Sequence, residues 1–148
     1  MSGDPNLRIL VVEDEILIAL ELESLLQDLG HEVVGLAASS GDAVAQGQAL
    51  RPDIAFVDIH LADGPTGVDV ARRLSGIGIT VLFMTANAKR IPEDAAGAQG
   101  VISKPYTERG VRQALAYVTA KDAAPLPAAD NLTFVPFRRR DERSSPRA

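Results

Sequence analysis

Short apolar runs alternate along the chain with longer segments in which apolar residues recur every three or four positions. The runs are rich in β-branched residues and predict buried strands, whereas the recurring spacing predicts amphipathic helices. We expect strands over residues 8–12, 31–37, 54–57, 79–84 and 100–102. We expect helices over residues 14–29 and 40–50, after a cap at Thr66, and over residues 91–97 and 107–121.

This alternation of strands and helices predicts an α/β domain built on a doubly wound parallel sheet. Almost wholly apolar strands belong to sheets that are covered on both faces, and parallel neighbours are joined by right-handed crossovers through helices. No fixed period repeats along the chain, and no heptad pattern is long enough for a coiled coil. The expected architecture is a five-stranded sheet with five helices.

The same pattern predicts where the domain begins and ends. It occupies residues 7–121, which leaves residues 1–6 as a disordered N-terminus and residues 122–148 as a C-terminal tail. Within the tail, the apolar and β-prone residues 132–137 precede three arginines at 138–140. This island docks on a partner, adds an edge strand or belongs to a flexible, solvated tail, and the Ser-Ser-Pro ending favours the flexible tail.

Composition and charge narrow the classes of function. The chain has 148 residues, 46% of them apolar, which suits one domain with a core. It has no cysteine, so disulfides, thiolate metal sites and thiol nucleophiles are excluded. Its net charge of −5 argues against binding to DNA. No apolar run is long enough to span a membrane and no signal peptide is evident, so we expect a cytoplasmic protein.

Polar side chains gather where the predicted strands end. Glu13 and Asp14 follow the first strand, Asp58 the third, Thr85 the fourth and Lys104 the fifth. Because ligands bind outside the carboxyl ends of the strands in an open parallel sheet, these residues are expected to converge in one shallow cleft. Each residue alone has an ordinary explanation, such as a helix cap or a turn, but their joint placement at one edge is a specific signal.

The three carboxylates of this cleft point to a metal ion. They repel one another unless a cation compensates their charge, and oxygen ligands without histidine or cysteine favour Mg²⁺ or Mn²⁺ over zinc. A carboxylate that faces such an ion is a nucleophile suited to phosphoryl transfer, with an acyl phosphate as the product. Asp58 would then accept the phosphoryl group, while Lys104 and Thr85 hold its remaining oxygens.

These residues and their order resemble the response-regulator receiver domain of two-component signalling, over residues 7–121. The resemblance implies a flavodoxin-like sheet with the strand order 2-1-3-4-5. It also implies that Asp58 is the phosphoacceptor. Asp14 would bind Mg²⁺ directly, Glu13 mainly through water, and the backbone carbonyl of His60 would supply a further ligand.

The resemblance assigns roles to residues on the last two strands as well. Thr85 would hydrogen-bond the phosphoryl group and move inward on phosphorylation, and Lys104 would pair with that group. Pro105 in this family typically follows a cis peptide bond, which would aim Lys104 into the cleft.

The switch of the family is altered in this chain. Most receivers carry an aromatic residue two positions before the lysine, where this chain has Ile102. Residues 83–85 (Phe-Met-Thr) and 104–106 (Lys-Pro-Tyr) resemble a variant subgroup with a Phe-Ala-Thr-Gly-type motif, whose members are often single-domain regulators. Tyr106 is therefore a candidate, beside Thr85, for the residue that changes position on phosphorylation. The alternative is that Tyr106 is an ordinary surface residue without a role in the switch.

Apolar residues near the acidic pair suggest where a partner docks. Ile16 and Leu20 lie off the core face of the first helix, and with Pro105 they are predicted to contact a sensor histidine kinase or a histidine phosphotransfer protein. The alternative is scattered surface apolarity, which is common. A homodimer through the fourth and fifth helices stays open.

The leading functional hypothesis is a single-domain response regulator of a two-component system or phosphorelay. It would catalyse only its own phosphorylation and dephosphorylation, so it is not an enzyme on an external substrate, and no DNA-binding helix-turn-helix follows residue 121. One alternative is a degenerate receiver that acts as a constitutive interaction module. Another is a Mg²⁺-dependent phosphatase, which would need a second acid where the chain has His60. A flavin site is excluded because acids stand where its phosphate loop would lie.

Overall fold

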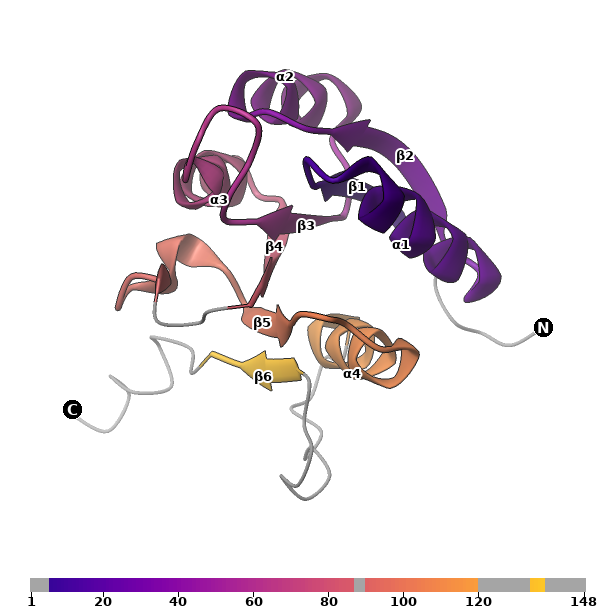
Figure 1. Ribbon diagram of the computed structural model, residues 1–148. Helices are drawn as coiled ribbons and strands as arrows, with labels where there is room; N and C mark the ends of the chain where they lie inside the picture. Colours follow the sequence, from indigo (N-terminus) through magenta and orange to yellow (C-terminus); the bar gives the residue numbers. More distant parts are fainter. Residues whose placement is uncertain (1–5, 87–89, 120–133, 138–148) are drawn as a thin grey trace.

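The computed structural model describes residues 6–86, 90–119 and 134–137. In this part of the chain a six-stranded sheet lies between two layers of helices (Figure 1). The strands are β1 (Arg8–Val12), β2 (Glu32–Ala37), β3 (Ile54–Asp58), β4 (Thr80–Thr85), β5 (Gly100–Ser103) and β6 (Phe134–Pro136). The helices are α1 (Ile16–Asp28), α2 (Ser40–Leu50), α3 (Gly67–Gly76) and α4 (Glu108–Thr119), with a short 3₁₀ helix, η2 (Ala95–Gly97).

The first five strands are parallel and follow the order β2-β1-β3-β4-β5. This confirms the flavodoxin-like, doubly wound sheet expected from the sequence. All residues of the central strand β3 are buried, because helices cover both of its faces. The apolar runs in the sequence are therefore the strands of a parallel sheet.

Two apolar cores lie on the two faces of this sheet (Figure 1). On one face α1 and α4 pack through buried residues such as Leu22 and Val111. On the other face α2 and α3 pack through buried residues such as Ala43 and Leu74. Among the helices of the described residues, none combines the length and the apolar content needed to cross a bilayer.

The helix expected over residues 91–97 is absent, and a single 3₁₀ turn at 95–97 stands in its place. Ala95 and Ala96 have φ angles of 58° and 50°, and these left-handed conformations are incompatible with an α-helix. The segment also buries only the small side chain of Ala96 and leaves Ile91 half-buried against the core, so packing adds little to stabilise a helix there. In the described residues the domain thus has four α-helices instead of five.

The apolar island of the tail forms a sixth strand at residues 134–136, which is the edge-strand alternative left open by the sequence and not the favoured flexible tail. This strand, β6, pairs antiparallel with β5 at the edge of the sheet. Phe134 is fully buried, and its ring centroid lies 5.6 Å from that of Tyr117 on α4. Gly100 leaves room for the ring, since a Cβ at this position would lie 2.5 Å from Phe134 Cε1. The expected domain limits at residues 6 and 121 stay predictions, because 1–5, 120–133 and 138–148 lie outside the described residues.

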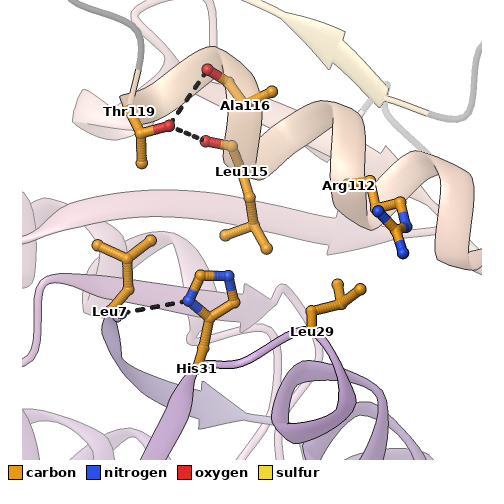
Figure 2. Close-up of a pocket in the computed structure, with 7 residues that line it drawn as sticks. All are labelled: Leu7, Leu29, His31, Arg112, Leu115, Ala116 and Thr119. Carbon is orange, nitrogen blue, oxygen red and sulfur yellow. Dashed lines mark hydrogen bonds between the residues drawn. The ribbon is translucent and has the colours of Figure 1, made fainter. Parts of the chain in front are cut away.

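A cavity of about 300 Å³ opens between the C-terminal ends of α1 and α4 (Figure 2). His31 Nδ1 accepts a hydrogen bond of 3.2 Å from the backbone N–H of Leu7, just before β1. This cavity lies at the amino end of β1, whereas the acidic residues follow the carboxyl end of that strand. It is therefore separate from the cleft expected from the sequence. Its walls are formed by Leu7, Leu29, His31, Arg112, Leu115, Ala116 and Thr119.

The buried position of Phe134 predicts that β6 contributes to stability. We expect Phe134→Ala to lower the free energy of unfolding by about 3 kcal/mol, because the truncation leaves a void between β5 and α4. Urea denaturation followed by circular dichroism measures this change. Val135→Ala lies on the same strand, but Val135 is 45% exposed, so this control should cost less than about 1 kcal/mol. Equal losses in the two variants would contradict the role of the buried ring.

Candidate functional site

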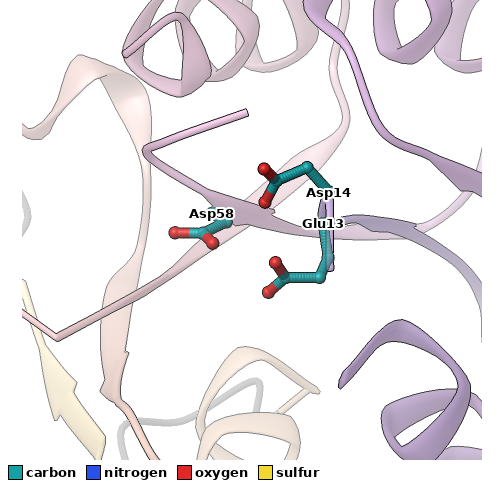
Figure 3. Close-up of side chains that lie close together, drawn as sticks. All are labelled: Glu13, Asp14 and Asp58. Carbon is teal, nitrogen blue, oxygen red and sulfur yellow. The ribbon is translucent and has the colours of Figure 1, made fainter. Parts of the chain in front are cut away.

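The acidic residues at the ends of β1 and β3 converge as expected. Glu13, Asp14 and Asp58 each offer one carboxylate oxygen, and these oxygens all lie within 4.8 Å of one another (Figure 3). Glu13 and Asp58 are buried, whereas Asp14 is exposed. The arrangement follows from the parallel pairing of β1 with β3, which brings both carboxyl ends to one edge of the sheet.

Lys104, directly after β5, reaches two of these carboxylates. Its Nζ donates hydrogen bonds to Glu13 Oε1 at 2.7 Å and to Asp58 Oδ2 at 2.8 Å. Burial alone would lower the pKa of Lys104, but the hydrogen bonds to Asp58 and Glu13 outweigh it and raise that pKa. The peptide bond between Lys104 and Pro105 is cis, as the sequence suggested. The Lys104 ammonium thus bridges the two buried carboxylates.

Glu13 connects this site to the beginning of α1. Its second oxygen, Oε2, accepts a hydrogen bond of 3.0 Å from the backbone N–H of Glu15, the N-cap residue of α1. Burial raises the pKa of Glu13 to about 7, although the hydrogen bonds from Lys104 and from the Glu15 backbone oppose this shift. The buried carboxylate is therefore sensitive to any change in the charge around it.

The other predicted ligands lie at the same edge of the sheet. Thr85 ends β4 and is 6% exposed, and its backbone carbonyl accepts a hydrogen bond of 3.0 Å from the backbone N–H of Lys104. His60 lies two residues beyond Asp58 and is exposed. The residues chosen from the sequence thus lie at one edge of the sheet, and their roles in binding and catalysis stay predictions.

Comparison with known proteins identifies the family. The family model described as the response regulator receiver domain matches residues 9–116. The chain belongs to the receiver-domain family. It is 36% identical over 118 residues to the phyllosphere-induced regulator PhyR of Methylorubrum extorquens. This match covers 75% of this chain and 43% of PhyR. It is also 30% identical to the chemotaxis protein CheY of Thermotoga maritima, over 73% of this chain and 93% of CheY.

Solved structures agree with this family. The receiver domain of PhyR from Erythrobacter litoralis has a TM-score of 0.72 and 30% sequence identity, and the match covers 83% of this chain and 97% of that domain. The chain spans less than half the length of the PhyR relative from Methylorubrum extorquens. What is shared with PhyR is therefore the receiver domain.

Two residues considered for the receiver switch lie in different surroundings. Ile102 is fully buried in the core shared by α1 and α4. Tyr106 is half-buried, and its hydroxyl donates a hydrogen bond of 3.3 Å to the backbone carbonyl of Ile18 in α1. Burial, followed by the charges of Glu21 and Glu13, raises the pKa of Tyr106 to about 12. Tyr106 is thus in contact with an element that the sequence did not connect to it.

The predicted partner-contacting residues are at the surface of the receiver domain. Ile16 is 60% exposed, Leu20 is 45% exposed, and Pro105 is also exposed. Leu17, which sequence reasoning missed, is 73% exposed beside them. Its signal was the run Ile16-Leu17-Ile18 near the start of a helix, since three consecutive side chains cannot all face one core.

The loop after Asp58 contains a second feature that the sequence did not reveal. The carboxylate of Asp63 accepts hydrogen bonds from the Ser40 hydroxyl at 2.5 Å and the Thr66 hydroxyl at 2.8 Å, and from the backbone N–H of Ser40. These bonds, led by the one from the Ser40 side chain, lower the pKa of Asp63 to about 2. Asp63 therefore ties the loop to the beginning of α2.

The depressed pKa of Asp63 predicts a pH-dependent contribution to stability. The folded-state pKa, about 2, lies below the ordinary value of 3.8, so the contribution is present above the ordinary pKa and is lost as the pH falls through the folded-state value. Asp63→Asn should therefore be less stable than the wild type near neutral pH, and the gap should close as the pH is lowered toward about 2. Urea denaturation at several pH values measures the gap. Asp28→Asn, which removes an exposed charge at the end of α1, is the control. A gap that stays constant with pH would contradict this role of Asp63.

Proposed function

We propose that this receiver domain accepts a phosphoryl group on Asp58 from a histidine kinase or a histidine phosphotransfer protein, with Mg²⁺ as its cofactor. The observation that supports the proposal is the convergence of three carboxylates and one ammonium at the carboxyl edge of the sheet. Asp58, like Glu13, belongs to the acidic group and also accepts a hydrogen bond from Lys104.

The charges of the cluster fit a divalent cation. The three carboxylates exceed the single ammonium of Lys104, so negative charge remains when Glu13 is ionised. Glu13, Asp14 and Asp58 would hold Mg²⁺, a hard cation that prefers oxygen ligands and retains several waters. When bound, Mg²⁺ supplies a positive charge that offsets the negative charge of phosphoryl oxygens.

The chain's own side chains support the transfer. Lys104 holds Asp58 Oδ2, which orients the carboxylate. A carboxylate oxygen of Asp58 attacks the phosphorus atom of a phosphohistidine, the P–N bond breaks, and its electron pair leaves with the imidazole. Lys104 and the Thr85 hydroxyl, at the neighbouring strand ends, would hydrogen-bond the transferred phosphoryl oxygens.

The output in this proposal is contact with other proteins or passage of the phosphate along a relay. The exposed Ile16, Leu20 and Pro105 are the surface for the kinase or phosphotransfer partner. In this proposal the domain catalyses only its own phosphorylation, in which the P–N bond of the donor breaks as the acyl phosphate forms, and the hydrolysis of that acyl phosphate. The proposal keeps the cytoplasmic location expected from the sequence.

A constitutive interaction module is the second candidate function. It is favoured by the buried Ile102 at the place of the usual aromatic switch and by the 3₁₀ turn at Ala95–Gly97, where a helix was expected. Such a module would bind its partner equally well with and without a phosphoryl donor. The two candidates therefore differ in their response to phosphorylation.

Acetyl phosphate tests the acceptor role of Asp58. We expect intact mass spectrometry to show one base-labile phosphoryl adduct that forms only with Mg²⁺ present, and Asp58→Asn should lose it because no acceptor carboxylate remains. Asp69→Asn, which removes an exposed carboxylate on α3, is the matched control and should keep the adduct. An adduct that persists in Asp58→Asn would contradict the assignment, and no adduct in the wild type would favour the constitutive module.

Titration calorimetry tests the metal site. Asp14→Asn should weaken Mg²⁺ binding by about tenfold or more, which corresponds to about 1.4 kcal/mol, because it removes an exposed anionic ligand. Glu15→Gln removes the next charge along the chain and is the control, whose affinity should stay within about twofold of wild type because exposed charges are screened. Equal losses for the two variants would show a diffuse electrostatic effect instead of a ligand.

A further inference from the structure

Tyr106 connects the loop that carries Lys104 to helix α1. The two residues are separated by one residue in the connection between β5 and α4. The Tyr106 hydroxyl donates its hydrogen bond to the carbonyl of Ile18, two residues into α1. Its half-buried ring also packs against the core on which α1 lies. A displacement of the loop therefore acts directly on α1.

The beginning of α1 receives a second contact from the same site. One carboxylate oxygen of Glu13 accepts a hydrogen bond from Lys104 Nζ, and the other accepts one from the backbone N–H of Glu15. The side chain of Glu15 itself makes no capping hydrogen bond. The beginning of α1 is thus held by Glu13 and by Tyr106. Lys104 contacts Glu13 directly and lies in the same loop as Tyr106.

Phosphorylation of Asp58 would change the balance of charges around Lys104. Its Nζ is shared between Glu13 at 2.7 Å and Asp58 at 2.8 Å. A phosphoryl group on Asp58 brings additional anionic oxygens to one side of this pair. The ammonium is then drawn toward the phosphoryl group and away from Glu13, and the loop that contains Tyr106 moves with it.

Two other connections of the site give no polar contact to α1 among the described residues. Asp63 ties the loop after Asp58 to α2 through the backbone and the hydroxyl of Ser40, and to Thr66 in its own loop. Ile102 is fully packed in the core and has no polar group with which to change partners. The hydrogen bond of Tyr106, in contrast, joins a loop residue to helix α1, on which Ile16, Leu17 and Leu20 are exposed.

We propose that Tyr106 is the positioning residue that transmits phosphorylation of Asp58 to the exposed apolar face of α1, formed by Ile16, Leu17 and Leu20. This inference rests on the proposed phosphorylation of Asp58. It assigns to Tyr106, through its hydroxyl, the role that the family gives to an aromatic residue two positions before the lysine. The consequence is a change in the surface that meets the partner.

Nuclear magnetic resonance with beryllofluoride and Mg²⁺, a stable mimic of the phosphoryl group on a carboxylate, tests this inference. In the wild type we expect shifts at the Asp58 and Lys104 amides, at residues 16–20 and at the Ile18 carbonyl. In Tyr106→Phe the shifts at Asp58 and Lys104 should persist, whereas the shift at the Ile18 carbonyl should be lost and those at residues 16–20 should be reduced to the part transmitted through Glu13. Tyr117→Phe is the matched control. It removes a hydroxyl that donates a hydrogen bond of 3.5 Å to the Phe137 carbonyl, and it should keep the shifts at the site and the shifts in α1.

The outcomes separate this inference from the proposed function. Shifts at Asp58 without any change at the Ile18 carbonyl in the wild type would overturn the role of Tyr106, whether or not the variant folds. Retention of the full α1 response in Tyr106→Phe, including the shift at the Ile18 carbonyl, or loss of that response in Tyr117→Phe, would also overturn it. If the wild type shows no response at Asp58, the proposed function itself fails, and the inference that rests on it fails too.

Discussion

The ion pairs of Lys104 with Glu13 and Asp58 are the interaction on which the cleft depends. Both carboxylates are at least nine-tenths buried, and a buried charge is strongly unfavourable unless an opposite charge and hydrogen bonds compensate it. The three residues follow β1, β3 and β5, and β4 lies between the last two. They meet only if these strands are parallel, adjacent in this order and in the observed register. The contacts of the site therefore depend on the topology of the sheet.

The same constraint explains why so much of the cleft could be predicted from the sequence. A strand buried on both faces is almost wholly apolar, so its end is marked by the first polar residue, as at Glu13 and after Val57. Parallel strands bring those ends to one edge, which places Asp58 and Lys104 together without any knowledge of their contacts. The bounds of helix α2 were also predicted correctly, at residues 40–50.

Other features depend on contacts that leave no local mark. Residues 91–97 were expected to form a helix, but the left-handed backbone of Ala95 and Ala96 prevents one there. Alanine rarely adopts this conformation, so the sequence gives no sign of it. The tail island reads as β-prone, yet only the space over Gly100 shows that Phe134 belongs to this sheet. Asp63 was missed for the same reason, since one of its partners, Ser40, is 23 residues away in sequence.

Glu13 is the residue in which these constraints meet. Its burial opposes ionisation and raises its pKa to about 7, and Lys104 is the cation that offsets this burial. If, in the proposed function, Lys104 turned toward a phosphoryl group on Asp58, Glu13 would lose its compensating cation, and a divalent ion held beside Asp14 would offset its charge. The proposed metal would then compensate this redistribution of charge as well as the incoming phosphate. Because the second oxygen of Glu13 accepts the backbone N–H of Glu15 at the start of α1, such an exchange of partners would change the electrostatic surroundings of that helix.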